Sequence, residues 1–343
     1  MALRIAALDA ARRPAWDAFV AAHPQASFFH RSLWLDVIDR AMGHTPQALI
    51  AEQDGAIAAI LPLVAVKSRL FGHRLVSLPF CVQGGLLSID PAADAALEQA
   101  AIALMDRSGA AFLELRDAVP AAPPFVAQRD LYVAFRKPIG ADDEANMKAI
   151  PRKQRAMVRK AIQHGLSSVV HRDAAALHRI YAESVRNLGT PVFSRRYFAI
   201  LLEAFGKDAD IVSVQDGETP VAAVMNFYFR DQVLPYYGGG TARARGCAGN
   251  DFMYWEVMRR AAAAGARLFD FGRSKIGTGA YAFKRNWGFE PVPMHYRYRL
   301  RPGDGVPEIN PLNPKYRLFI AAWKRLPLPL ANAIGPHLAR GLG

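Results

Sequence analysis

The sequence contains few of the features that stabilise or target a secreted protein. Only Cys81 and Cys247 are cysteines, which excludes a disulfide framework and a cysteine-based zinc site. The first residues include charged side chains and no sustained apolar segment of the kind found in signal peptides. The longest apolar run, Ala56–Val66, contains Pro62 and is shorter than the ~20 residues that a membrane-spanning helix needs. We therefore expect a cytoplasmic protein, at most peripheral to the inner membrane.

Several catalytic signatures are also missing. There is no Gly-x-Ser-x-Gly nucleophile elbow, no phosphate-binding P-loop and no glycine-rich dinucleotide fingerprint. The nine histidines form no His-x-x-x-His or His-Glu-x-x-His pair, so no metal site is predicted. These absences disfavour covalent, nucleotide-hydrolysing and metal-dependent mechanisms. The remaining possibility is a site that positions its reactants and stabilises charge.

The composition is that of a folded protein with an excess of positive charge. Hydrophobic residues make up 52% and charged residues 21% of the chain, and 343 residues suit two domains. The formal net charge is +13, from 43 lysines and arginines against 30 acidic residues. This excess favours anionic partners such as RNA, coenzyme A, a nucleotide-linked substrate or an acidic membrane face, whereas DNA is not expected. A basic surface that is merely solvated is the alternative.

The two halves of the sequence repeat the same order of features. Asp54-Gly55 and Asp216-Gly217 each separate two apolar runs and predict β-hairpins. Later in each half, a helical pattern stops at a glycine, Gly109 or Gly265, and a strand pattern follows. We interpret this order as a duplicated α+β unit.

The duplication also suggests boundaries: a first domain over 1–145, a second over 146–305 and a tail over 306–343. Pro151 opens a predicted helix that extends to about His164, and its basic face either is solvated or attracts phosphate. Prolines in the tail precede a basic amphipathic helix over 315–326. That helix either packs its apolar side on its own domain, which we favour, or lies on an acidic membrane surface.

The most informative segment runs from Leu268 to Glu290. A buried-type strand is expected to end in the loop Gly272–Lys275, and a short basic, aromatic helix then stops at a glycine. Lys284 lies in this helix among aromatic residues, so partial desolvation could place its ammonium close to an oxyanion. An ordinary surface lysine is the alternative.

Other polar residues of this segment are candidates as well. Asp270 alternates with two phenylalanines and should point away from both, toward a polar cleft or toward a structural partner. Arg273 and Ser274 could contact a phosphate or a carbonyl, although Ser274 could instead cap a helix.

A second candidate region precedes a run of three glycines. Tyr236 and Tyr237 are expected to end a strand and open a flexible loop over Gly238–Gly240. Tyrosines at such a position can line a substrate channel, and packing at the sheet edge is the alternative.

Four motifs occur together in the second half: Tyr236–Gly240, Asn250–Trp255, Phe269–Ser274 and Phe283–Phe289. In combination they resemble the FemAB family of the GNAT-like acyltransferase superfamily, in particular the FemAB-type proteins of exosortase/PEP-CTERM systems. The resemblance implies two tandem GNAT-like domains, each with a mixed, mostly antiparallel sheet flanked by helices. It also implies transfer of an acyl or aminoacyl group from an activated ester or thioester to an amine, in peptidoglycan, exopolysaccharide or other cell-envelope biosynthesis.

The resemblance also implies roles for single residues. Lys284 matches a lysine that stabilises the reacting carbonyl, and Asp270 is the second catalytic candidate. Arg186 occupies roughly the place of an arginine that holds the phosphates of the precursor. The remaining residues expected to bind substrate are Tyr236, Tyr237, Asn250, Arg273, Ser274, Tyr281 and Phe283.

The donor and the acceptor stay open at this point. No tightly bound cofactor is expected, and the co-substrate is either an acyl-CoA or an aminoacyl-tRNA. Arg243–Ala248 fits the Arg-x-x-Gly-x-Ala pattern with which GNAT enzymes hold the coenzyme A pyrophosphate, or it is a simple loop before a helix. The expected acceptor is an envelope precursor with an amine. The alternative function is a non-catalytic GNAT-like scaffold that docks on a membrane-associated envelope assembly, with membrane contact through 315–326.

Overall fold

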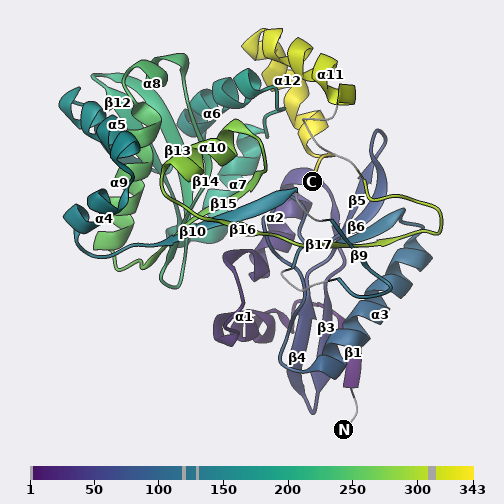
Figure 1. The fold of residues 1–343 in the computed structure, drawn as a ribbon. Helices are drawn as coiled ribbons and strands as arrows, with labels where there is room; N and C mark the ends of the chain where they lie inside the picture. Colours follow the sequence, from purple (N-terminus) through teal and green to yellow (C-terminus); the bar gives the residue numbers. More distant parts are fainter. Residues whose placement is uncertain (1–2, 118–120, 129–130, 308–313) are drawn as a thin grey trace. The chain divides into compact units, whose positions relative to one another are not determined.

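The computed structural model describes residues 3–117, 121–128, 131–307 and 314–343, and these residues form two compact units (Figure 1). Neither unit is continuous in sequence. The first consists of residues 1–131, 294–308 and 340–343, and the second of residues 132–293 and 309–339. The chain therefore passes from one unit to the other more than once.

The first unit contains two sheets. One has the strand order β1-β3-β4-β7 and the other β2-β5-β6-β8-β17-β9. The strands are β1 Leu3–Ala7, β2 Thr45–Pro46, β3 Leu49–Gln53, β4 Ala56–Leu61, β5 Val64–Ser68, β6 Gly72–Val76, β7 Leu87–Ser88, β8 Phe112–Leu115, β9 Val126–Gln128 and β17 Tyr296–Leu300. The helices are α1 Arg13–Ala22, the short 3-10 helix η1 Phe28–His30, α2 Leu33–Met42 and α3 Pro91–Ser108.

The second unit is built on one seven-stranded sheet, with the order β11-β12-β13-β14-β15-β10-β16. Its strands are β10 Tyr132–Pro138, β11 Ser167–His171, β12 Ala209–Asp216, β13 Thr219–Phe229, β14 Gln232–Gly240, β15 Leu268–Lys275 and β16 Pro291–Pro293. Its helices are α4 Asp143–Ala149, α5 Arg152–Gln163, α6 Ala174–Leu188, α7 Arg195–Phe205, the 3-10 helix η2 Gly206–Asp208, α8 Ala242–Gly246, α9 Gly249–Ala263, α10 Gly279–Asn286, α11 Pro314–Arg325 and α12 Leu328–Ala339.

Local sequence signals explain where several of these elements begin and end. Both expected hairpins form, because β3 pairs with β4 and β12 pairs with β13 across the two Asp-Gly turns. The helix stops are also confirmed. Gly109 follows α3 and Gly265 lies just beyond α9, and both adopt the left-handed backbone conformation that ends a helix at low cost.

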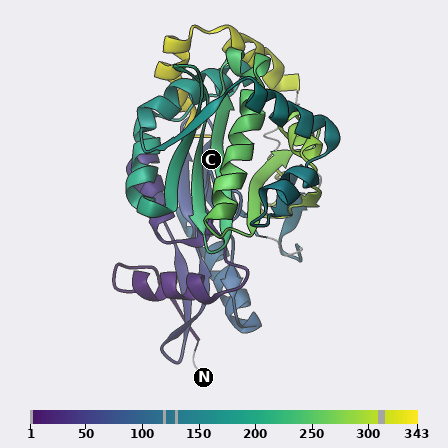
Figure 2. The same cartoon turned by 90° about the vertical axis from the view of Figure 1, so that its left-hand side faces the viewer.

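Three glycines of β14 allow helices to pack closely on both faces of the sheet. A Cβ on Gly239 would lie 2.5 Å from the Ser184 Cβ of α6. A Cβ on Gly240, which faces the opposite way, would lie 2.5 Å from the Asn250 Oδ1 of α9. Helices α6 and α9 therefore cover opposite faces of the sheet, and α9 is seen running beside the strands in Figure 2.

Two segments expected to be loops are strands. Gly238–Gly240 pairs with Ala222–Val224 of β13, so β14 continues through the glycines. Strand β15 likewise continues through Lys275, paired with β10. Both expectations relied on glycine as a strand terminator, whereas here the glycines permit close packing or a bulge within the strand.

The division into units differs from the expected boundaries at 145/146 and 305/306. Strand β10 lies before the expected boundary, yet it pairs with β15 and β16 of the second unit. Strand β17 lies before the second boundary, yet it pairs with β8 and β9 of the first unit. In both places a strand belongs to the unit whose strands it pairs with, although those strands are distant in sequence.

The tail helix packs on its own unit. Trp323 of α11 is 4% exposed, and Ile320 lies against Gly189 at the end of α6. Residues Leu318 and Phe319 of the same helix are 84% and 44% exposed, so part of its apolar surface is not covered. Among the described residues, no helix combines the length and the hydropathy needed to cross a membrane.

We predict that Gly239→Ala lowers the free energy of unfolding by about 1–3 kcal/mol, because the added methyl group overlaps Ser184 in a packed interface. Gly140→Ala is the matched control, since a Cβ at Gly140 meets no atom within 4 Å. Urea unfolding of both variants tests this. Equal stabilities for the two would contradict the packing described for β14.

Candidate functional site

The site forms where two neighbouring parallel strands separate. Strands β14 and β15 pair only through Gln232 with Leu268 and Val233 with Phe269, at the start of each strand. Beyond these pairs, β14 continues beside β13 and β15 continues beside β10. The facing edges of β14 and β15 are thus released from the ladder toward their C-terminal ends, where backbone groups can bind a ligand.

A bulge in β15 shapes this edge. Arg136 of β10 lies opposite Asp270 and Ala134 lies opposite Arg273, so β15 contains one residue more than its partner between these pairs. Gly272 adopts φ 66° within the bulge, a value that glycine tolerates best. The bulge turns the backbone carbonyls of Gly272 and Arg273 to the side occupied by α10.

Asp270 holds this bulge in place. The Asp270 carboxylate is 4% exposed as a residue and accepts a hydrogen bond from the Gly272 N–H (2.7 Å) and one from Arg136 Nε (2.8 Å). Both carboxylate oxygens are therefore bound to the protein. Of the two alternatives for Asp270, the structure shows the partnered carboxylate.

Lys284 points from α10 back to the bulge. Its Nζ donates to the carbonyl of Arg273 (2.9 Å) and lies 3.5 Å from that of Gly272. The ammonium is 5.6 Å from the ring centroid of Phe135 and 5.7 Å from that of Phe271. Lys284 is thus partly buried between aromatic faces and is not a solvated lysine.

These surroundings change the acidity of Lys284. Burial lowers the pKa of Lys284 from 10.5 to about 7 because the charged form loses hydration. The negative charge of Asp270 opposes the lowering of this pKa, and the positive charge of Arg273 adds to it. The amine can therefore change its charge near neutral pH.

Aromatic side chains enclose the lysine. The Tyr254 ring of α9 packs edge-on against Phe271 with centroids 4.7 Å apart, and it also contacts Phe283 at 5.7 Å. Tyr281 packs against Phe135 at 5.6 Å. The two aromatic residues predicted at this site, Tyr281 and Phe283, thus belong to the wall around Lys284.

Tyr254 was not singled out from the sequence, although it lies within one of the four motifs. Its hydroxyl is 2.9 Å from where a Cβ on Gly238 would stand, so Tyr254 reaches from β15 to β14 across the point where these strands separate. Burial raises the pKa of Tyr254 to about 12, so its hydroxyl remains protonated and able to donate a hydrogen bond.

The remaining predicted residues lie at separate places in the same unit. The Arg273 guanidinium stacks over Tyr132 at 4.5 Å. Ser274 is a buried mid-strand residue, not a helix cap, and its Oγ has no hydrogen-bond partner among the described residues. Asn250 lies in the first turn of α9, beside Gly240, and its Oδ1 likewise has no described partner.

Three predicted residues, Tyr236, Tyr237 and Arg186, have their described contacts with other residues than Lys284. Tyr237 is 4% exposed and hydrogen-bonds through its hydroxyl to the hydroxyl of Tyr197 (2.6 Å), in an aromatic cluster that includes Tyr236. Arg186, near the end of α6, donates to the Lys324 carbonyl of α11 (3.1 Å). These contacts place Tyr237 and Arg186 in the packing of α6, α7 and α11.

A buried carboxylate links the site to two helices and was missed by sequence reasoning. Asp251, in the first turn of α9, accepts hydrogen bonds from Gln154 Nε2 of α5 and from Trp287 Nε1 (3.1 Å) just after α10. Burial raises the pKa of Asp251, while these hydrogen bonds oppose the increase. The available signal was a carboxylate in the first turn of a helix, followed directly by the apolar and aromatic run Phe252–Trp255.

The Arg243–Ala248 segment is not an extended loop. It forms the short helix α8 before the left-handed Ala248, and no side chain in the described chain caps the helix α9 that follows. Arg243 Nε donates to Asp216 (2.7 Å) on the β12–β13 turn, so this arginine already has a partner. No group of three or more His, Cys, Asp or Glu side chains in the described ranges could hold a metal ion.

Comparison with known proteins identifies a domain type and a fold. Residues 152–285 match the family model of the acetyltransferase (GNAT) domain. The fold is similar to the crystal structure of FemX (TM-score 0.67, 16% identity, covering 92% of this chain and 100% of that one). It is also similar to a tandem GNAT protein from the clavulanic acid biosynthesis pathway (TM-score 0.56, 14% identity, covering 88% of this chain and 100% of that one). A third similar structure is that of L-PGS from Bacillus licheniformis (TM-score 0.53, 13% identity, covering 91% of this chain and 97% of that one).

These similarities confirm the expected α+β fold with tandem GNAT-like domains. At such identities the structural matches describe the fold alone. No curated protein matches the sequence.

We predict that Asp251→Ala destabilises the protein by about 1–3 kcal/mol for each of the two buried donors left without an acceptor. Glu144→Ala is the control, because it removes an exposed ion pair with Lys148 and should change stability by less than about 0.5 kcal/mol. Chemical unfolding monitored by tryptophan fluorescence compares the two. A small effect at Asp251 would show that this carboxylate does not hold the helices together.

Proposed function

We propose that this chain is an N-acyltransferase of the FemAB/GNAT type, with its reaction centre at Lys284. The observation that carries the proposal is a lysine ammonium fixed at a strand bulge, partly desolvated between aromatic rings, in a segment that matches the GNAT domain. A cation in a site of low dielectric stabilises a developing negative charge far better than one in water.

The proposed reaction needs no covalent bond to the protein. The amine nitrogen of the acceptor attacks the carbonyl carbon of the donor, and the carbonyl oxygen becomes an oxyanion that accepts a hydrogen bond from Lys284 Nζ. Collapse of this intermediate breaks the carbon–sulfur or carbon–oxygen bond. The nitrogen loses its proton, and the released thiolate or alkoxide takes one up. Positioning of the two substrates supplies much of the rate.

Asp270 acts on this chemistry through Lys284. Its carboxylate is bound to Arg136 and Gly272, so it fixes the bulge carbonyls that orient the ammonium. Its charge also favours the protonated lysine. We assign Asp270 as a positioning residue, in place of the direct catalytic role expected from the sequence.

The donor proposed first is an acyl-CoA, because the GNAT domain match covers the part of the chain that contains Lys284 and the N-terminus of α9. One feature of α9 suits such a donor: no side chain in the described chain caps its N-terminus, where backbone N–H groups can bind the phosphates of coenzyme A. Aminoacyl-tRNA is the second donor class. The proposed acceptor is an amine of a peptidoglycan, exopolysaccharide or other cell-envelope precursor, in keeping with the fold similarity to FemX and the resemblance to exosortase-associated FemAB-type proteins.

The tail supports a peripheral contact with an anionic membrane surface. Leu318, Phe319 and Leu330 are 84%, 44% and 46% exposed. Exposed basic residues Arg317, Lys324 and Arg325 accompany them, and the sequence from 314 to 339 contains no acidic residue. Apolar side chains together with cations of one sign suit a surface of anionic lipid headgroups. The same contact would serve a non-catalytic scaffold, so catalysis has to be tested separately.

We expect Lys284→Ala to lower kcat/KM for acyl transfer by about 100-fold, the usual effect of removing one oxyanion donor. Lys284→Arg should keep part of the activity. The folded pKa of Lys284 is depressed to about 7, so the ammonium is lost as the pH rises through 7. The wild-type rate should therefore fall on the alkaline side of pH 7, and this limb should be absent in Lys284→Arg because a guanidinium stays charged.

The direction of the pH limb discriminates between roles. A rate that rises through pH 7 and loses this dependence in Lys284→Arg would make Lys284 a base and refute its proposed role as a cation. Turnover unchanged in Lys284→Ala would remove the residue from the mechanism. Asp270→Asn should shift the alkaline limb to lower pH, since the negative charge that favours the ammonium is gone.

For the tail, we expect Leu318→Ser/Phe319→Ser to reduce co-sedimentation with phosphatidylglycerol vesicles, with no binding of either protein to phosphatidylcholine vesicles. Ile89→Ser is the control, because Ile89 is 70% exposed and belongs to the first unit. Equal sedimentation of the tail variant and the control would refute the membrane contact.

A further inference from the structure

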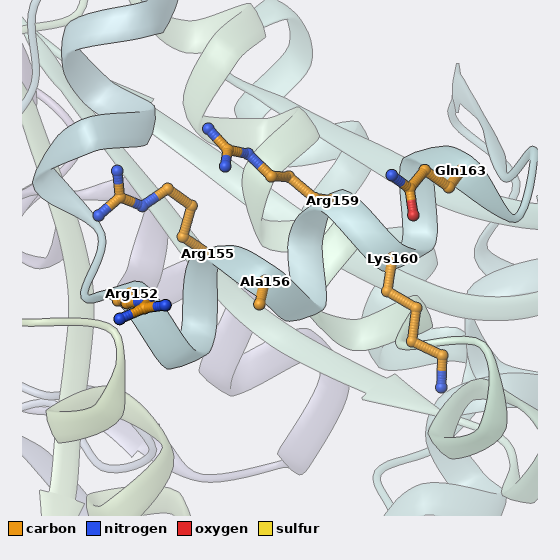
Figure 3. A pocket seen from close by; sticks show the side chains of 6 residues that line it. All are labelled: Arg152, Arg155, Ala156, Arg159, Lys160 and Gln163. Carbon is orange, nitrogen blue, oxygen red and sulfur yellow. The ribbon is translucent and has the colours of Figure 1, made fainter.

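A pocket of about 480 Å³ lies on α5 and is lined almost entirely by cations. Its lining residues are Arg152, Arg155, Ala156, Arg159, Lys160 and Gln163. They recur at helical spacing and form one face of α5, from which the four charged side chains fan out in Figure 3. No acidic residue lines the pocket, and within the described chain Arg152, Arg155 and Arg159 make no ion pair.

This arrangement opposes the stability of the helix that contains it. Arg152 and Lys153 occupy the first turn of α5, where the helix dipole disfavours cations, and that turn contains no acidic residue. Arg155 also lies one turn from both Arg152 and Arg159, a spacing at which like charges repel. A solvated helix face gains nothing from such a pattern, whereas an anion bound between these side chains would remove the repulsion.

The opposite face of α5 is held firmly against α9. Gln154 is 9% exposed and donates to the buried carboxylate of Asp251 in the first turn of α9. At the other end of α5, Lys160 Nζ donates to the Gly246 carbonyl of α8 (3.2 Å). The pocket is therefore fixed relative to the segment that precedes the N-terminus of α9.

The charge around this segment extends the pocket. Asp216 lies 3.3 Å from His164 at the end of α5 and 2.7 Å from Arg243 of α8, so these two residues share one acidic partner. Arg245, which is exposed on the same short helix, makes no ion pair among the described residues. Arg245 thus adds one positive charge on the segment that precedes α9.

We propose that the α5 pocket binds phosphate groups at the nucleotide end of the acyl donor, an inference that rests on the proposed function. Arginine side chains suit this ligand because each guanidinium offers two parallel donors to a phosphate. In this arrangement the pocket holds the nucleotide portion of the donor, and the acyl end is bound near Lys284.

Binding without turnover tests this. Coenzyme A, dephospho-coenzyme A, which lacks the 3′-phosphate, and a short RNA hairpin are titrated calorimetrically into wild-type protein, Arg155→Gln/Arg159→Gln and Arg195→Gln/Arg196→Gln. The last variant is the matched control, because it removes the same charge from exposed positions on α7. Unfolding of each variant is measured in parallel, and the α5 variant should be at least as stable as wild type, since it loses like-charge repulsion.

We expect the α5 variant to bind coenzyme A at least about tenfold more weakly than wild type, and the control to stay within about twofold. If the difference disappears with dephospho-coenzyme A, the pocket binds the 3′-phosphate. If instead the α5 variant binds the RNA hairpin more weakly than wild type does, the phosphates are those of a polynucleotide donor, and the proposed pocket is also supported.

Equal affinities of the α5 variant and the control for every probe would overturn the proposal, as would failure of the wild-type protein to bind any of them. The outcome of these binding titrations can be distinguished from that of the activity measurements on the Lys284 variants. If the α5 variant keeps its affinity while Lys284→Ala abolishes transfer, the proposed function stands and the phosphate pocket falls.

Discussion

One buried carboxylate joins the three helices around the candidate site. Asp251 accepts hydrogen bonds from α5 through Gln154 and from the end of α10 through Trp287, while its own backbone belongs to α9. A carboxylate in such a place is costly unless its oxygens are satisfied, so the two donors and the acceptor depend on one another. The position of Lys284 on α10 and that of the cations on α5 are therefore set by the same group.

The proposed reaction centre depends on the bulged segment of β15. The bulge at Gly272 exists because β15 contains one residue more than β10, and Asp270 satisfies the Gly272 N–H that the bulge releases from the ladder. Its carbonyls in turn hold the Lys284 ammonium. The bulge, the salt bridge between Arg136 and Asp270 and the low pKa of Lys284 are thus linked, because Asp270 contacts the bulge and its charge acts on the Lys284 amine.

Sequence reasoning predicted the features that depend on residues close together in the sequence. The two hairpins and the glycine stops after α3 and α9 follow from turn and cap chemistry, and Tyr281 and Phe283 were found because they lie next to Lys284 in sequence. Sequence reasoning missed the features that depend on pairing between strands far apart in the sequence. Gly272 ends a strand in the sequence pattern but forms a bulge once β10 lies beside it, and the Arg136 partner of Asp270 comes from that same strand. The burial of Tyr237 and the link between Gln154 and Asp251 likewise depend on helices packed from elsewhere in the chain.

The interleaved path of the chain limits how the protein can be divided. Strand β17 lies between β8 and β9 in the sheet of the first unit, yet in sequence it follows all residues of the candidate site. A fragment cut after residue 293 would lack the strand that joins β8 to β9, and one starting at 132 would contain β17 without these two neighbours. A single cut between the two units therefore cannot give two fragments that each contain a complete sheet set.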